Sequence, residues 1–150
     1  MKKSAGILPF RRSKGETELY LIHMGGPFWR NRKRAWSIVK GEIEEGEDPL
    51  SAALREFEEE TGAAIEGEFL PLGEVKSSNK IIRAWAVEAE PPTRIRSNTF
   101  EIEWPPKSGK RERFPEADRA AWFTPREAKE VIVKSQIPLI ERLEELLRKN

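Results

Sequence analysis

A short acidic run, EFEEE, lies near the middle of the chain and includes Glu56, Glu59 and Glu60. Glu59 and Glu60 follow Glu56 by three and four residues, so on a helix all three side chains project from one face. Like charges at this spacing repel one another unless a positive charge lies between them. Because carboxylate oxygens are hard ligands, the cluster is a candidate site for Mg²⁺ or Mn²⁺ rather than for zinc. A solvated acidic helix is the alternative interpretation.

The acidic run lies in a segment that has the features of an amphipathic helix. Asp48 is a favourable N-cap, and Pro49 suits the first helical position. Gly62 is placed to end the helix in a left-handed turn. Between them, apolar residues repeat at the spacing of a buried stripe, at Leu50, Ala53, Leu54 and Phe57. We therefore predict a helix from Pro49 to about Thr61, with one face in a core and the carboxylates on another.

Other residues stand at fixed positions around the carboxylates. The segment 41–63 has a Gly, five residues, a Glu, seven residues and then the run REFEEETGA. This pattern resembles the signature of the Nudix hydrolases, which ends in Arg-Glu-apolar-any-Glu-Glu-any-Gly-apolar. The matching positions are Gly41, Glu47, Arg55, Glu56, Phe57, Glu59, Glu60, Gly62 and Ala63. Only Ala63 departs from the pattern, because a larger aliphatic residue is usual there.

The resemblance implies a hydrolase that uses Mg²⁺ or Mn²⁺. The implied metal ligands are Glu56, Glu59, Glu60 and the backbone carbonyl of Lys40. Arg55 is expected to pair with Glu47 and hold the loop against the helix, which makes it a scaffold residue rather than a substrate ligand. An ordinary surface ion pair is the alternative for these two residues, and it would contribute at most about 1 kcal/mol.

The general base is expected among the carboxylates, and members of this family take it from different places. Glu56 and Glu59 are candidates within the motif, and Glu116 resembles the extra carboxylate that some members contribute from a late loop. Glu101 and Glu103 are rivals, because they alternate with apolar residues along a predicted strand. The same alternation is typical of a strand that faces solvent.

Basic and aromatic residues directly before the motif are candidates for substrate binding. The basic residues are Arg30, Arg32, Lys33 and Arg34, and a second basic cluster comprises Lys107, Lys110, Arg111 and Arg113. Either cluster could bind phosphates, although a run of charge is usually a solvated face. Phe28 and Trp29 could stack on a base, an interaction of about 1–3 kcal/mol. His23, the only histidine, is expected to be a satisfied polar group.

Within the family, three segments resemble the diadenosine tetraphosphate hydrolase branch. They are SAG from Ser4, WSIVKG from Trp36 and AWFTPREA from Ala121. The first expectation is therefore hydrolysis of a dinucleoside polyphosphate, and the second is a nucleoside triphosphate pyrophosphohydrolase. Diphosphoinositol or capped-RNA substrates fit the basic loops as well. A nucleotide-sensing module without catalysis is a further alternative, but it gives no reason to keep the carboxylates crowded together.

The order of elements predicts a mixed α/β (α+β) domain over residues 1–150. Expected strands are 4–10, 18–24, 36–39, 69–75, 81–87, 100–104 and 120–123, and two further helices are expected at 125–132 and 138–149. Residues 105–113 are expected to form a basic loop. This order resembles the Nudix fold, a mixed sheet between helices with a loop-helix-loop motif. Trp36, Trp85 and Trp122 are expected in the core.

Composition excludes several classes of protein. The formal net charge is only +1, from 27 basic and 26 acidic residues, so nothing favours a stable nucleic-acid or membrane partner. The chain has no cysteine, which excludes disulfides and thiolate metal sites. No segment has the length of a signal-peptide core or a membrane span. A cytoplasmic protein with a nucleotide substrate is the expectation, and the sequence leaves the oligomeric state open, a homodimer included.

Overall fold

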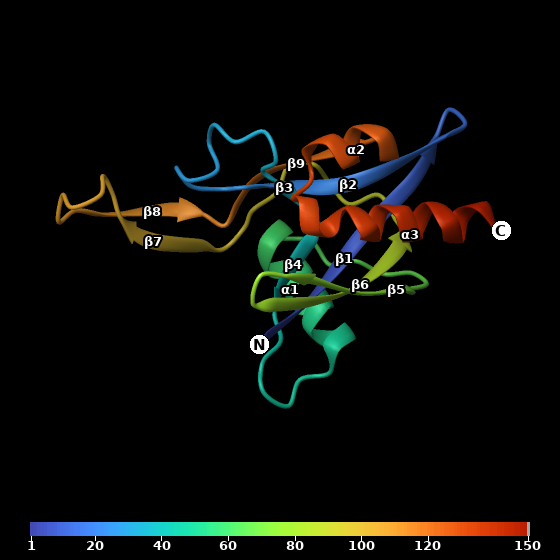
Figure 1. Ribbon diagram of the computed structural model, residues 1–150, viewed down its shortest axis with the longest axis horizontal. Helices are drawn as coiled ribbons and strands as arrows, with labels where there is room; N and C mark the ends of the chain where they lie inside the picture. Colours follow the sequence, from blue (N-terminus) through green and yellow to red (C-terminus); the bar gives the residue numbers. More distant parts are fainter. Residues whose placement is uncertain (150) are drawn as a thin grey trace.

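A seven-stranded mixed sheet forms the centre of the molecule in the computed structural model, which describes residues 1–149 (Figure 1). Its strands are β1 (Lys2–Ser13), β2 (Glu16–Met24), β3 (Trp36–Ser37), β4 (Val39–Glu42), β5 (Leu70–Ser77), β6 (Lys80–Glu88) and β9 (Ala117–Phe123). The order is β3-β2-β1-β6-β5, with β4 also paired to β1 and β9 to β2. Strands β1 and β6 are parallel, and the other pairs are antiparallel.

Helices cover both faces of this sheet. Helix α1 (Pro49–Thr61) packs on β1 and β4 over one core cluster, which includes Tyr20 and Phe57. The short helix α2 (Pro125–Val131), the 3-10 turn η1 (Lys134–Gln136) and helix α3 (Ile137–Arg148) cover a second cluster on the other face. The predicted mixed α+β architecture is confirmed. Among the described helices, none combines the length and apolarity that crossing a membrane requires.

Helix α1 begins and ends as its sequence predicts. The Asp48 side chain accepts a hydrogen bond from the Ser51 N–H, and Pro49 occupies the first turn. Gly62 adopts a left-handed φ of 80°, and its N–H donates to the Glu58 carbonyl. Within the predicted stripe Ala53 and Phe57 are fully buried, while Leu50 and Leu54 are only partly buried. Of the tryptophans expected in the core, Trp85 is buried, and Trp36 and Trp122 are half-buried.

The strand predicted at 36–39 divides into β3 and β4 at Ile38. The Ile38 N–H donates to the Gln136 side chain at 2.9 Å, rather than to a neighbouring strand. Ser37 hydrogen-bonds the same glutamine, which is 1% exposed. A buried side chain from a distant element therefore interrupts the strand. Sequence patterns do not reveal such a partner.

The second difference from prediction is a two-stranded ribbon that projects from the body of the molecule (Figure 1). Strand β7 (Thr99–Glu103) pairs antiparallel with β8 (Arg111–Pro115), in a stretch expected to be mostly loop. The predicted loop at 105–113 was wrong from residue 111 onward, where β8 begins. The segment RERFP is highly charged and ends in proline, so it lacks the apolar alternation that marks most strands.

Replacement of Phe57 by alanine is expected to destabilise the protein by about 3–5 kcal/mol, because it removes a fully buried aromatic ring. The Phe57 ring lies 6.1 Å from that of Tyr20, between α1 and the sheet. Urea unfolding measures the change in free energy. Phe28→Ala is the matched control, because Phe28 is 60% exposed. Equal stability losses in the two variants would contradict the placement of α1.

Candidate active site

One arginine joins the loop before α1 to the carboxylates on the helix. The Arg55 guanidinium donates two hydrogen bonds to the Glu47 carboxylate, from Nε at 2.8 Å and from Nη2 at 3.0 Å. Its Nη1 also donates to Glu56 at 2.9 Å and to Glu59 at 3.1 Å. A further bond reaches the Glu42 carbonyl at the end of β4. These contacts raise the pKa of Arg55, with the Glu47 hydrogen bonds as the largest cause. Arg55 thus pairs with Glu47 as the sequence predicted, and the pair joins the loop to the helix.

Glu47 is held in its charged form. The Arg55 hydrogen bonds lower the pKa of Glu47 from 4.5 to about 2, and a hydrogen bond from the Glu44 N–H adds to the effect. The carboxylate thus bridges the loop backbone and the helix. This bidentate geometry is more specific than an ordinary surface pair.

Gly41 leaves room for the Glu56 carboxylate. A Cβ atom at this position would lie 2.0 Å from the Glu56 carboxyl carbon, so the side chain could not keep its place. The backbone of Gly41 is not in the left-handed region. Glycine is therefore needed here for close approach rather than for an unusual turn. Burial is the main cause that raises the pKa of Glu56, against the hydrogen bond from Arg55.

Glu60 faces a small cavity of about 110 Å³ together with Lys40 and Glu116. Only 9% of Glu60 is exposed, and none of the side-chain hydrogen bonds among residues 1–149 involves its carboxylate. Burial, followed by repulsion from Glu116 and Glu56, raises the pKa of Glu60 to about 8. The Lys40 ammonium group opposes this shift, and burial lowers its own pKa. The sequence predicted only the Lys40 carbonyl for this site, and its side chain was missed.

Glu116 reaches the site through a chain of backbone hydrogen bonds. The Asn98 N–H donates to the Glu59 carbonyl at 3.0 Å, and the Asn98 carbonyl accepts from the Glu116 N–H at 2.8 Å. The Glu116 carbonyl in turn accepts from Gly25. Asn98 is thus a positioning residue that sequence reasoning missed, since nothing in its neighbourhood marks it. Burial raises the pKa of Glu116.

The donor set fits a hard divalent cation. Glu56, Glu59 and Glu60 lie near the C-terminal end of α1, where the helix dipole already disfavours negative charge and no basic residue occupies the last turn. A buried, unpaired carboxylate beside like charges is most readily stabilised by a cation. As the side chains stand, no three acidic groups within residues 1–149 converge on one point. Glu56 and Glu59 instead both accept hydrogen bonds from Arg55 Nη1.

Glu101 and Glu103, the alternative carboxylates, make their contacts within the β7–β8 ribbon. Glu101 pairs with Arg111 and Arg113, and these contacts lower its pKa, mainly through the Arg111 hydrogen bond. Glu103 accepts the N–H groups of Lys107 and Gly109 at the tip of the ribbon. Neither lines the cavity that holds Glu60. The geometry therefore favours Glu116 over both as the additional carboxylate.

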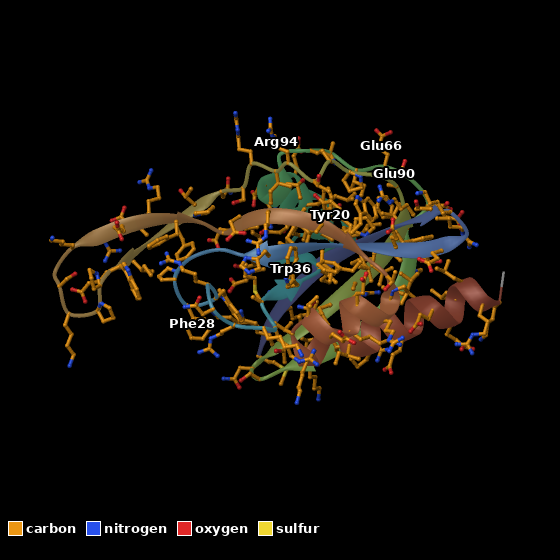
Figure 2. All side chains as sticks on the ribbon, turned by 90° about the horizontal axis from the view of Figure 1, so that it is seen from above. Tyr20, Phe28, Trp36, Glu66, Glu90 and Arg94 are labelled. Carbon is orange, nitrogen blue, oxygen red and sulfur yellow. The ribbon has the colours of Figure 1, made fainter. Side chains whose placement is uncertain are left out.

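The loop between β2 and β3 starts at the site, but its basic residues have different roles. Met24 lines the cavity beside Glu60. Arg34 donates to two carbonyls at the end of α2, at 2.8 Å each, and so has a structural role. Arg32 lies 4.0 Å above the Phe28 ring, which projects from the loop (Figure 2). Arg30 is exposed.

The aromatic residues of this loop form a small stacked unit. Phe28 and Trp29 meet edge to face with their ring centroids 4.9 Å apart. Phe28 remains 60% exposed, so one large apolar surface is free to meet a base. His23, by contrast, is buried and bonds Asp118 through Nδ1 at 3.0 Å. It is the satisfied polar group that the sequence predicted.

Comparison with protein families gives one decisive match. The family model of the NUDIX domain matches residues 1–143. The chain belongs to the Nudix family. The resemblance carried by residues 41–63 is thereby confirmed. These residues, which include Arg55 and the glutamates that it bonds, form the Nudix motif of this chain.

Two curated proteins are similar over shorter segments. A stretch of 63 residues is 41% identical to an RNA pyrophosphohydrolase of Rhodospirillum rubrum, covering 39% of this chain and 36% of that protein. A stretch of 72 residues is 38% identical to an octanoyltransferase of Myxococcus xanthus, covering 47% of this chain and 18% of that protein. The chain thus matches only about a third of the length of the first relative and less than a fifth of the second.

Solved structures share the whole fold. An Ap4A hydrolase of C. elegans, in a binary complex, has a TM-score of 0.71 and 19% identity over 100% of both chains. The NUDIX domain of Shewanella oneidensis NrtR, complexed with ADP ribose, has a TM-score of 0.67 and 14% identity over 98% of this chain and 88% of that one. At these identities the likeness shows the fold alone.

Gly41→Ala is expected to keep the fold and to weaken Mn²⁺ binding by about tenfold to a hundredfold, because the new methyl group displaces the Glu56 carboxylate. Manganese titration followed by electron paramagnetic resonance measures the affinity. Thermal unfolding is the control, and an unchanged melting temperature shows that only the carboxylate has moved. Wild-type affinity in this variant would contradict the role assigned to Gly41.

Glu47→Gln is expected to lower the melting temperature near neutral pH, and the deficit should shrink in acid. Because the pKa of Glu47 is about 2 in the folded protein, its stabilising effect is present above pH 4.5 and is lost as the pH falls toward 2. Melting temperatures of wild type and variant across this range measure the difference. Glu45→Gln, at an exposed position in the same loop, is the control. A deficit that stays constant down to pH 2 would exclude this linkage.

Proposed function

We propose that this chain is a metal-dependent pyrophosphohydrolase that cleaves a phosphoanhydride bond in a nucleoside polyphosphate. The observation that carries the proposal is the largely buried Glu60 side chain, which makes no side-chain hydrogen bond within residues 1–149 and lies beside Glu116 and the Arg55-bound glutamates. A sensor module would not need this concentration of negative charge, which is costly in the absence of a cation.

The proposed metal ion is Mg²⁺ or Mn²⁺, held by Glu56, Glu59, Glu60 and the Lys40 carbonyl. When bound, such an ion neutralises phosphate charge and lowers the pKa of an attacking water. Glu116 lines the same cavity, and its carboxylate would accept the proton of that water. Arg55 keeps the loop and helix in register throughout, and it contributes no contact to the substrate.

The first candidate substrate is a dinucleoside polyphosphate such as diadenosine tetraphosphate. In support, the fold matches that of an Ap4A hydrolase along its whole length. The exposed Phe28 ring offers a stacking surface, and Arg30 and Arg32 lie in the same loop to meet phosphates. Arg34 contributes to the position of this loop rather than to binding.

The second candidate substrate is the 5′ end of a triphosphorylated RNA or a free nucleoside triphosphate. It is favoured by the 41% identity with an RNA pyrophosphohydrolase across 63 residues. Both candidates use the same carboxylates. They differ in what would contact the basic loop. With a dinucleoside polyphosphate it would be the second nucleoside, and with RNA it would be the polynucleotide chain.

A substrate panel with Mg²⁺ or Mn²⁺ tests the proposal, with products resolved by chromatography. Diadenosine tetraphosphate is expected to give ATP and AMP. Pyrophosphate released from a nucleoside triphosphate, or from triphosphorylated RNA, would instead establish the second candidate. No product from any compound, with nucleotide still bound, would reject the enzyme and favour a sensor.

Matched variants of α1 test which carboxylates act. Glu59→Gln and Glu60→Gln are each expected to lose most of the turnover and to keep the fold, because they lose charge and not packing. Glu58→Gln is the control, because Glu58 lies between active positions but is exposed on another side of the helix. Full activity in the Glu60 variant would refute its assignment as a metal ligand.

A further inference from the structure

A second hollow is lined by residues of the β1–β2 hairpin, the start of α2 and the last turns of α3. The hairpin and the end of α3 lie at the end of the molecule away from the β7–β8 ribbon (Figure 1). Its volume is about 680 Å³. Pockets for small organic ligands typically have volumes of about 300–1,000 Å³. The hollow is therefore large enough for a ligand that the candidate active site does not require.

The floor of this hollow is apolar. Leu19 and Leu143, each 1% exposed, form its base, and Leu147 adds a partly buried side chain. Pro125 closes one wall. Because Leu19 and Leu143 are already buried, a ligand with an apolar body would cover mainly the exposed surface of Leu147 and Pro125.

The rim of the hollow is rich in arginine. Arg12, Arg126 and Arg148 all line it. Among the described residues, no carboxylate forms a salt bridge with Arg12 or Arg126, and Arg148 contacts only an exposed glutamate of its own helix. Such guanidinium groups are free to bind an anion. Their planar donor sets match the oxygens of a phosphate group.

The acidic residues of the rim do not cancel this charge. Glu144 is already paired with Lys129, which leaves Glu16 as the unpaired acid among the residues that line the hollow. The side chains around the opening therefore carry a net positive charge. This charge favours an anionic ligand over a neutral or cationic one.

The hollow is separate from the carboxylate site. Leu19 and Leu143 belong to the core cluster beneath α2 and α3. Helix α1, which carries Glu60, packs over the cluster on the other face of the sheet. The two sites share no lining residue, so a ligand in the hollow would not compete directly with a substrate.

We propose that this hollow binds a small organic phosphate, with its apolar body on Leu147 and Pro125 and its phosphate between Arg12 and Arg126. A nucleoside monophosphate and an alkyl phosphate share this chemistry. Both combine a body that fits an apolar floor with a dianionic head group that suits more than one guanidinium. This inference does not depend on which substrate the carboxylates cleave.

Nuclear magnetic resonance titration of the full chain tests the proposal with three probes, namely octyl phosphate, AMP and inorganic phosphate. Saturable shifts at the amides of Leu19, Thr124 and Leu147 are expected with octyl phosphate, with AMP or with both. Comparison of these two probes identifies the preferred body. Inorganic phosphate is expected to bind at least about tenfold more weakly, because it has no apolar body. Equal affinity for inorganic phosphate would overturn the proposal, as would shifts confined to α1.

Variants of the hollow provide the second test. Arg126→Glu and Leu147→Asp should each weaken binding of the preferred probe by about tenfold or more, because one loses a charged hydrogen bond and the other an apolar contact. Arg126 is exposed, so its replacement leaves the core intact. Arg94→Glu is the matched control, at an exposed arginine that does not line the hollow. Unchanged affinity in both hollow variants, or an equal loss in the control, would refute the assignment.

Discussion

The site depends on the Arg55 guanidinium more than on any other group. Helix α1 carries its carboxylates at the end where its own dipole repels them, and they also repel one another. Arg55 donates to both Glu56 and Glu59 and so offsets that repulsion. The same side chain fixes the preceding loop through Glu47. The Arg55 guanidinium therefore stabilises the helix and holds the Glu56 and Glu59 carboxylates close together.

Strand β1 supplies the surface on which this arrangement is built. It pairs with β4 so that Ala5 lies opposite Gly41 and Gly6 opposite Lys40. A Cβ atom at Gly6 would come within 2.9 Å of the Lys40 Cβ, so the two strands require glycine at this crossing. Gly41 then leaves space for the Glu56 carboxylate on the helix side. Two small residues thus allow a strand, a loop and a helix to approach one another closely enough to form the cavity.

Local features of the sequence predicted local parts of the site. Capping residues and apolar spacing gave the bounds of α1, and the motif gave the Arg55 and Glu47 pair. Long-range features were not accessible in this way. The interruption at Ile38 depends on a buried glutamine far along the chain, and the pairing of β8 depends on β7 rather than on its own composition. The two bonds of Arg34 to α2 likewise turned an expected phosphate ligand into a structural residue. Patterns over a few residues carry no information about such partners.

The hydrogen bond between the Asn98 carbonyl and the Glu116 N–H closes the ribbon at its base. Because both ends are fixed there, and Asn98 is itself bonded to α1, the position of Glu116 is independent of how many residues the ribbon contains. The entropic cost of a longer loop grows only slowly with length. We therefore expect insertions and deletions within residues 99–115 to leave the carboxylate in place. The length of the β7–β8 ribbon could thus change while Glu116, at its base, keeps its position.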